Sequence, residues 1–297
     1  MNLKHRLAYG IKRGLKYGIY VPVFAFLAVF GLIPAMGLLI GSLTDSHGPT
    51  IQYYHQSVQG QYLHAFLTTF WLSVESGAIG LVWGAVVTWS VTRVRLPWVE
   101  RMITALSSTM ANFAALPLAI AFMATLGASG MITSLINHLF AVNLAQMGWN
   151  ISSEQGLLVI YTTFQAPLAV ILLLPAMNSL ESQWEEAVYT LGASLRTYVG
   201  RVVIPILLPG LLGTFALLFA NSFSAYVTAY AISGGSINLL PLQIGYLIDG
   251  NVTLNVGLGD ALAVEEMAVL AISLGLFFAM SKFQSARMGK EQKSHAA

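Results

Sequence analysis

Six long apolar stretches constrain the fold of this chain more than any other feature of its sequence. Each is long enough, as a helix, to cross about 30 Å of hydrocarbon, and none shows the period-two alternation of a membrane β-strand. Charged residues make up only 9% of the chain, whereas a soluble domain carries about a quarter. The sequence therefore predicts an all-α, polytopic membrane protein with six transmembrane helices. Their expected bounds are 18–42, 66–92, 103–127, 155–178, 208–232 and 261–283.

The fourteen Lys and Arg residues are distributed around these stretches in a regular way. They precede the first stretch, separate the second from the third and the fourth from the fifth, or lie at or after the end of the sixth. The other connections, residues 43–65, 128–154 and 233–260, contain neither Lys nor Arg. Positive residues favour the cytoplasmic side of a membrane helix. We therefore expect both termini, and the connection between the fourth and fifth stretches, to be cytoplasmic.

We expect one membrane domain, residues 18–284, flanked by two short cytoplasmic segments. Residues 1–17 form a basic amphipathic segment suited to the membrane surface, and residues 285–297 form a polar, disordered tail. The first apolar stretch lacks a convincing cleavage site, so we interpret it as a retained helix. No internal repeat is recognisable, so a second chain of the same kind, identical or related, is expected to complete any solute path.

The composition excludes several kinds of site. The chain contains no Cys and therefore no disulfide and no thiolate metal ligand. Its only Gly-Lys pair, Gly289-Lys290, is followed by Glu291, so it has no P-loop for ATP. The His residues of 43–65 are too irregularly spaced to indicate a metal site. We predict no catalytic residue, no metal site and no bound cofactor in this chain, which is therefore not an enzyme.

The connection between the fourth and fifth stretches, residues 180–207, contains a polar segment. From Glu186 onward it reads EAVYTLGASLRTYVGRVVIPILLPG. The pattern predicts a helix to about Leu191, a left-handed residue at Gly192, and a second helix that Pro205 interrupts near the membrane. The plainer alternative is an amphipathic hairpin with no special purpose.

The spacing within this segment resembles the signature loop of permease subunits in bacterial ATP-driven (ABC) importers. That family pattern is Glu-Ala-Ala, three residues, Gly, nine residues and Ile-x-Leu-Pro. Here the spacing is intact, with conservative departures at three positions. The matching residues are Glu186, Ala187, Gly192 and Pro205, and the departures are Val188, Val202 and Ile204.

The resemblance implies a type I ABC importer permease in the bacterial cytoplasmic (inner) membrane. In that family the short helix docks in a groove of the ATP-hydrolysing subunit, so ATP and Mg would be bound by that partner. The residues expected to couple this chain to the ATPase are Glu185, Glu186, Ala187, Gly192, Ala193 and Pro205. The expected partners are two ATP-binding subunits, a second permease subunit, an extracytoplasmic solute-binding protein and membrane lipid, but no nucleic acid.

Shorter matches extend the resemblance over residues 66–283. They look most like the branch of the family that transports polyamines, phosphonates and iron, although they do not identify the solute. The matching residues are Phe66–Ser73, Leu116-Pro117, Gly127, Gly130, Phe223–Tyr226, Gly234-Gly235 and Leu240–Leu242.

Polar residues within the apolar stretches are candidates for a solute path, because such side chains are costly to bury in lipid without a partner. The candidates are Glu75, Asn112, Gln165, Asn221 and Tyr226. Alternatively, the amides form structural hydrogen bonds between helices. Between the fifth and sixth stretches, Gly234, Gly235 and Pro241 break the helical pattern and form either an outer gate or an ordinary loop.

Two other functions are compatible with six membrane helices. A proton-coupled secondary transporter could use Glu75, but it would leave the signature segment unexplained. An intramembrane enzyme would require a clustered nucleophile and base or metal ligands, and only His138 lies near a stretch. We therefore predict the permease subunit of an ATP-driven importer for a small solute, with proton-coupled transport as the alternative.

Overall fold

The structure is a computed structural model that describes residues 20–94, 96–113, 115–180, 182–249 and 255–295. Six of its helical stretches are long and apolar enough to cross a membrane, which confirms the predicted all-α fold with six transmembrane helices. These stretches are Val21–Leu43, Gly60–Val94, Ala115–Phe140, Glu154–Asn178, Leu195–Phe223 and Val256–Phe283. The amphipathic segment predicted for residues 1–17 lies outside the described residues.

The chain divides into two compact units. Unit 1 comprises Met1–Gln59 and Ile244–Glu265, and unit 2 comprises Gly60–Gln243 and Glu266–Ala297. In unit 1, Ser57 of α4 donates a hydrogen bond to the Glu265 carboxylate of α15. The elements of unit 1 are α2 (Val21–Leu27), the π-helical turn η1 (Ala28–Leu32), α3 (Ile33–Leu43), the hairpin of β1 (Thr44–Asp45) and β2 (Gly48–Pro49), α4 (Gln52–Ser57), most of α14 (Leu240–Asp249) and the start of α15 (Val256–His295).

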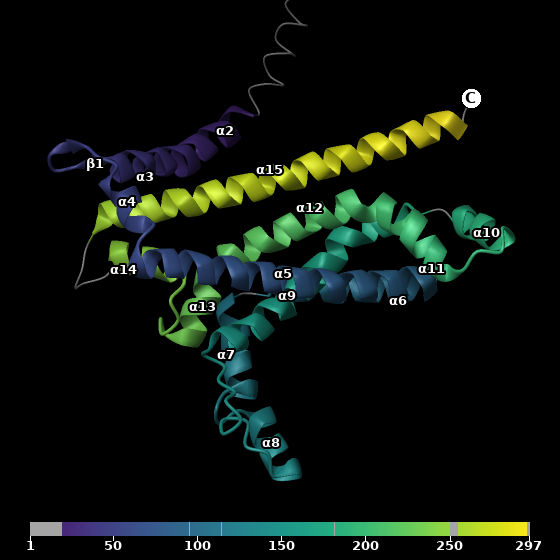
Figure 1. The fold of residues 1–297 in the computed structure, drawn as a ribbon, viewed down its shortest axis with the longest axis horizontal. Coiled ribbons are helices and arrows are strands. Elements are labelled where there is room, and N and C mark those ends of the chain that lie inside the picture. The colour runs from purple at the N-terminus through teal and green to yellow at the C-terminus, as the bar shows by residue number, and fades with distance from the viewer. Residues whose placement is uncertain (1–19, 95, 114, 181, 250–254, 296–297) are drawn as a thin grey trace, which may run out of the picture. The chain divides into compact units, whose positions relative to one another are not determined.

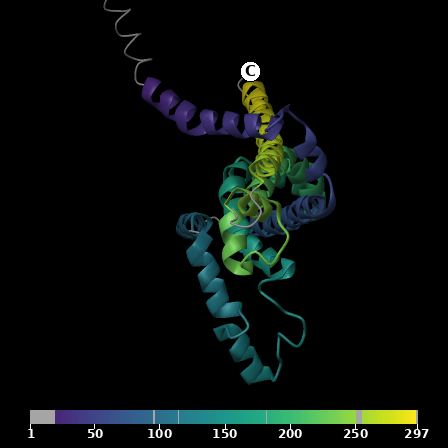
Figure 2. The same cartoon turned by 90° about the vertical axis from the view of Figure 1, so that its left-hand side faces the viewer.

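Unit 2 contains the remaining helices, in which α5, α9 and α12 pack against one another (Figure 1). Two helices, α7 and α8, extend away from these three in both views (Figures 1 and 2). The elements are α5 (Gly60–Val94), α6 (Pro97–Ala111), α7 (Ala115–Leu126), α8 (Met131–Phe140), α9 (Glu154–Asn178), α10 (Ser182–Thr190), α11 (Leu195–Tyr198), the π-helical turn η2 (Val199–Val203), α12 (Ile204–Phe223) and α13 (Tyr226–Ser233), with the start of α14 and the rest of α15.

Glycines on α5 allow this helix to approach α9 closely. A Cβ added at Gly80 would meet Gln165 and the backbone of Ala166, and one added at Gly84 would meet Ala169. Lipid tails are as apolar as the helix surfaces, so close packing of small residues, and not hydrophobic burial, drives association of membrane helices. The seam between α5 and α9 therefore depends on these two glycines.

The third crossing differs from its predicted bounds of 103–127. Helix α6 ends at Ala111, a new helix α7 begins at Ala115, and the candidate span extends to Phe140. Pro117 accounts for the break, because it lacks an N–H and its ring would clash with the carbonyl oxygen of residue 113 in a continuous helix. The Asn112 amide donates to the Ser108 carbonyl at 2.8 Å and so caps the last turn of α6.

The fifth crossing begins earlier and ends earlier than the predicted range of 208–232. Helical structure runs without interruption from Leu195 to Phe223, so the prediction that Pro205 interrupts the helix is wrong. The π-helical turn η2 precedes this proline, and the Ile204 N–H donates to the carbonyl of Val199, five residues back. A wider turn of this kind accommodates the ring and the missing donor of a proline.

The connection between α13 and α14 is folded into the protein. Leu239 and Leu240 are almost fully buried, and the Leu240 N–H donates to the Thr69 hydroxyl at 2.8 Å. The Asn238 amide donates to the carbonyl of Gln61 at 2.8 Å. Non-helical backbone is tolerated at membrane depth where protein satisfies its polar groups, as it does here.

The end of the chain also differs from its prediction. Helix α15 continues to His295, so the expected disorder of the polar tail is wrong for most of its length. Lys, Glu and Gln, which are frequent there, are good helix formers.

Candidate functional site

The polar segment forms a helix, a glycine turn and a second helix, as its sequence predicts. Gly192 has a φ of 73°, a left-handed conformation that costs an L-residue free energy. Its N–H donates to the carbonyl of Tyr189 at 2.9 Å, and the Ala193 N–H donates to the carbonyl of Val188 at 3.1 Å. These two bonds define a Schellman motif, which satisfies the last carbonyls of α10.

One face of this hairpin is anchored to the membrane helices. Trp184 and Val188 of α10 pack against a buried cluster formed by the ends of α9, α11 and α12. The members of this cluster are Ala176, Met177, Tyr198, Val203 and Leu207. The anchoring fixes the orientation of α10 and leaves its other face toward the solvent.

The solvent-facing side of the hairpin carries half of the residues predicted to couple the chain to an ATPase, namely the exposed Glu186, Ala187 and Gly192. Pro205 is also exposed, but it lies in the first turn of α12, outside the hairpin. Leu191 is 84% exposed. The hairpin therefore presents a small, mixed polar and apolar surface.

Glu185 and Ala193, also predicted as coupling residues, are half-buried. The Glu185 carboxylate forms an ion pair with Arg93, in the last turn of α5. The Arg93 guanidinium lies 4.4 Å from the centre of the Trp89 ring, a cation–π contact. The sequence indicates neither Arg93 nor Trp89 as part of this site.

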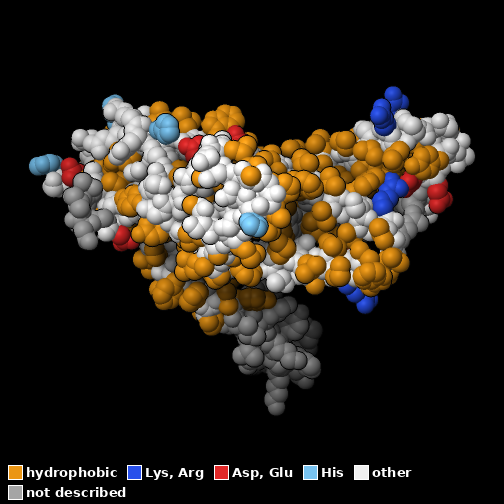
Figure 3. Space-filling view, turned by 90° about the horizontal axis from the view of Figure 1, so that it is seen from below, with side chains coloured by type: hydrophobic (Ala, Val, Ile, Leu, Met, Phe, Trp, Pro, Cys, Tyr) orange, Lys and Arg blue, Asp and Glu red, His pale blue; other side chains and the backbone are white. Residues whose placement is uncertain are grey.

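The described Lys and Arg side chains of unit 2 gather at the end that carries this hairpin. Figure 3 shows these cations together at that end. They are Arg93, Arg101, Arg196, Arg201 and Lys282. Their common location agrees with the alternation of cation-rich and cation-free connections in the sequence.

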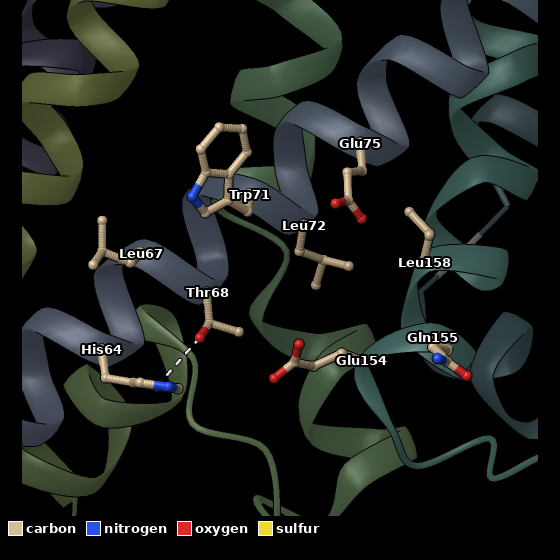
Figure 4. Close-up of a pocket in the computed structure, with 9 residues that line it drawn as sticks. All are labelled: His64, Leu67, Thr68, Trp71, Leu72, Glu75, Glu154, Gln155 and Leu158. Atoms are coloured by element: carbon tan, nitrogen blue, oxygen red, sulfur yellow. Dashed lines mark hydrogen bonds between the residues drawn. The ribbon is translucent and has the colours of Figure 1, made fainter. Parts of the chain in front are cut away.

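A second feature is a pocket of about 390 Å³ between the N-terminal parts of α5 and α9. The carboxylates of Glu75 and Glu154 both point into it (Figure 4). Neither carboxylate has a hydrogen-bond or ion-pair partner among the residues that the structure describes. The pocket is lined by His64, Leu67, Thr68, Trp71, Leu72, Glu75, Glu154, Gln155 and Leu158.

Gln165, one of the residues predicted for the solute path, is buried between helices. Its amide nitrogen donates to the Leu218 carbonyl and to the Ser222 hydroxyl, both at 2.5 Å. Its oxygen accepts from Asn221 at 3.2 Å, and Ser222 is also bonded to Ser76 at 2.8 Å. This network joins α5, α9 and α12, as expected for amides that hold membrane helices together.

The remaining predicted path residues lie elsewhere in unit 2. Asn221 and Tyr226 line a second pocket of about 270 Å³, beside Phe113 and Phe164. Asn112 caps α6. The five predicted residues therefore do not converge on one cavity, and the first pocket pairs Glu75 with Glu154, which the sequence does not indicate.

The predicted outer-gate residues lie in the connection from α13 to α14. Gly234 and Gly235 have φ values of 55° and 86°, and the Gly235 N–H donates to the Ser233 hydroxyl at 3.1 Å. Pro241 lies in the first turn of α14.

Among the described residues, no three His, Asp or Glu side chains are grouped so that they could hold a metal ion.

Known proteins resemble this chain over most of its length. Residues 78–288, well over half of the chain, match the family described as the binding-protein-dependent transport system inner membrane component. Over 144 residues the chain is 28% identical to the spermidine/putrescine transport system permease protein PotC of Haemophilus influenzae, an alignment covering 48% of this chain and 54% of that protein. The chain thus spans about half the length of that relative.

Another relative is the putative 2-aminoethylphosphonate transport system permease protein PhnU of Salmonella typhi. It is 23% identical over 231 residues, which cover 76% of this chain and 78% of that protein. Among solved structures, a bacterial ABC transporter involved in the import of the acidic polysaccharide alginate has a chain with the same fold. Its TM-score is 0.69 at 15% identity, and the superposition covers 95% of this chain and 99% of that chain.

Proposed function

The chain belongs to the family of inner membrane components of binding-protein-dependent transport systems and is thus a permease subunit of an ABC importer. We propose the following orientation in the membrane and the following partner subunits. Both termini and the hairpin of α10 and α11 are cytoplasmic. A second permease subunit, identical or related, completes the solute path. Two separate ATP-binding subunits bind ATP and Mg, and an extracytoplasmic solute-binding protein delivers the solute.

The observation that carries this proposal is the two-faced hairpin. Its inner face is fixed to α5, α9 and α12, whereas Glu186, Ala187 and Leu191 face the solvent. Three large apolar side chains of the hairpin, Tyr189, Leu191 and Leu195, are exposed, and exposed apolar groups rimmed by polar residues are typical of a surface that a partner protein covers. We assign this face to the ATP-binding subunit.

A charge-reversal experiment tests this assignment. We call the solvent-facing surface of Glu186, Ala187 and Leu191 the docking face. The double variant Glu186→Arg with Gly192→Arg places two bulky cations on or beside it, and we expect the ATP-binding subunit to be lost from the purified complex. Arg101→Glu is the matched control, because Arg101 is exposed on α6, outside the hairpin. Normal co-purification of the doubly substituted protein would contradict the assignment.

We further propose that the pocket of Glu75 and Glu154 forms part of the solute path, together with the pocket of Asn221 and Tyr226. Unpartnered carboxylates are costly within a membrane unless they face water or a ligand. They attract cations. Polyamines and aminophosphonates carry protonated amines, and a ferric ion is itself a cation. The proposed solute is therefore a small polyamine, phosphonate or iron species.

The cognate solute-binding protein offers the most direct test of the solute class. Polyamines, aminophosphonates, ferric chelates and sugars would be screened for the rise in thermal stability that binding produces. We expect a cationic or amine-bearing compound to give the largest shift. A shift produced by neutral sugars alone would contradict the proposed solute class while leaving the permease function intact.

A further inference from the structure

Arg93 contacts three side chains at the surface of unit 2. Its guanidinium pairs with Glu185 of α10 and lies 4.4 Å from the Trp89 ring centre and 5.9 Å from that of Tyr198. Tyr198 is only 3% exposed, and the Glu185 side chain is 16% exposed. Most surface ion pairs contribute little, whereas here the Arg93 side chain, itself 35% exposed, also contacts two aromatic rings, and its partner Glu185 is more buried.

The position of this ion pair matters because, among the described residues, no other hydrogen bond or ion pair joins a side chain of α10 to the membrane helices. Trp184 and Val188 pack against the buried cluster, but apolar contacts of this kind are not directional. At its C-terminal end the chain turns at Gly192, where bending can absorb a movement. An Arg–carboxylate pair resists displacement, because its hydrogen bonds require a fixed geometry.

Helix α5 extends from this ion pair to the pocket that contains Glu75. It is one continuous helix of 35 residues. Glu75 precedes Arg93 by eighteen residues, which corresponds to about 27 Å along a straight helix. A force applied to α10 and passed to the end of α5 therefore reaches the residues that line the pocket.

We propose that Arg93 is a positioning residue that links α10 to α5, so that movement of the docking face is transmitted along α5 to the Glu75 pocket. This inference rests on the proposed function, since it requires an ATP-binding subunit that moves α10. Loss of the ion pair leaves the docking face itself intact. The ATP-binding subunit still binds, but its movement is no longer passed on to the solute path.

The test uses the assembled complex in proteoliposomes, with uptake and ATP hydrolysis measured together. For Arg93→Gln we expect the ATP-binding subunits to co-purify while uptake per ATP hydrolysed falls about tenfold, within the usual range of coupling between sites. Arg93→Lys retains the charge but not the planar fork, so its effect is smaller. Arg101→Gln removes a cation from the same end of unit 2 and is the matched control.

Exchange of the two charges separates positioning from a general structural role. The double variant Arg93→Glu with Glu185→Arg restores the pair, and we expect it to recover uptake per ATP relative to either single variant. This comparison also applies if Arg93→Gln fails to assemble. An assembled double variant that remains uncoupled would overturn the proposal, as would normal coupling in Arg93→Gln.

The absence of Cys allows a direct measurement of how α10 is held. A spin label attached to the cysteine of a Leu191→Cys variant reports the local mobility of the hairpin in the purified permease. We expect the label to become more mobile when Arg93→Gln is added and to be unchanged by Arg101→Gln. Unchanged mobility with Arg93→Gln would overturn the inference. Failure of the unmodified complex to retain any ATP-binding subunit would instead contradict the proposed function.

Discussion

Two regions of unit 2 contain acidic side chains in opposite circumstances. Glu185 of α10 forms an ion pair with Arg93 at the end of α5, and the Arg93 guanidinium lies near the Trp89 and Tyr198 rings. Glu75 of α5 and Glu154 of α9 face one pocket without a partner among the described residues. A carboxylate with a fixed partner is suited to holding two helices in register, whereas an unpartnered one is available to a ligand. From this difference we expect a mechanical role for the first region and a binding role for the second.

Both regions depend on the seam between α5 and α9, and the largest effect is expected there. In Gly84→Leu the new side chain would meet Ala169 and the backbone beside it, at a cost of about 3 kcal/mol. We expect a marked drop in thermal stability in detergent and loss of both ATPase binding and uptake. Gly275→Leu on α15 is the matched control, since a Cβ there has no neighbour within 4 Å. Equal stability of the two variants would show that the seam is not closely packed.

The binding role predicts the next largest effect. If Glu75 and Glu154 attract a cationic group, Glu75→Gln and Glu154→Gln each lower the uptake rate about tenfold, because a charged hydrogen bond contributes about 1.5 kcal/mol. Gln155→Glu adds a third carboxylate to the same pocket and is expected to increase retention of a cationic solute. Unchanged uptake in both Gln variants would remove the pocket from the solute path.

The same assay addresses the proton-coupled alternative based on Glu75. Uptake by an ABC importer requires ATP and persists when an ionophore collapses the proton gradient. We expect this behaviour from the unmodified protein. Uptake that continued without the ATP-binding subunits and ceased with the ionophore would favour proton coupling.

The sequence predicts the hairpin better than the pocket for a physical reason. The hairpin is a contiguous segment whose turn is marked by Gly192, so local spacing is sufficient to recognise it. The pocket combines residues from α5 and α9, and the ion pair joins residues 92 positions apart. Such partners depend on helix packing, and so the sequence indicates Glu75 and Glu185 but neither Glu154 nor Arg93.

The helix boundaries show a similar limit. Six apolar stretches suffice to predict six crossings, because each stretch is itself long enough to span the membrane. Two prolines near helix boundaries have opposite effects on the helix. The helix is interrupted before Pro117, whereas it continues through Pro205, which the π-helical turn η2 accommodates. Hydropathy does not distinguish these cases, because both prolines lie in strongly apolar segments.

A smaller effect is expected at the turn of the hairpin. Gly192→Ala forces a left-handed alanine, at a cost of about 1 kcal/mol, although open space surrounds the position. We expect faster hydrogen exchange of the amides of residues 191–193, which close the end of α10. Gly200→Ala is the control, since Gly200 is helical and also in open space, and alanine favours a helix. Slower or equal exchange in Gly192→Ala would contradict the importance of the left-handed turn.

The smallest effect is expected in the neutral network between the two regions. Ser222→Ala removes the bonds of its hydroxyl to Gln165 and Ser76. Interhelical hydrogen bonds of this kind contribute about 0.6 kcal/mol in membrane proteins, so a small drop in melting temperature is expected. Ser73→Ala is the control, because the buried Ser73 hydroxyl bonds only within its own helix, to the Thr69 carbonyl at 2.7 Å, and lines neither pocket. Uptake should be nearly unchanged in both variants, since Gln165 is buried between helices and lines neither pocket. A large loss of uptake with normal stability in Ser222→Ala would instead place this network on the solute path and weaken the distinction between paired and unpaired polar groups.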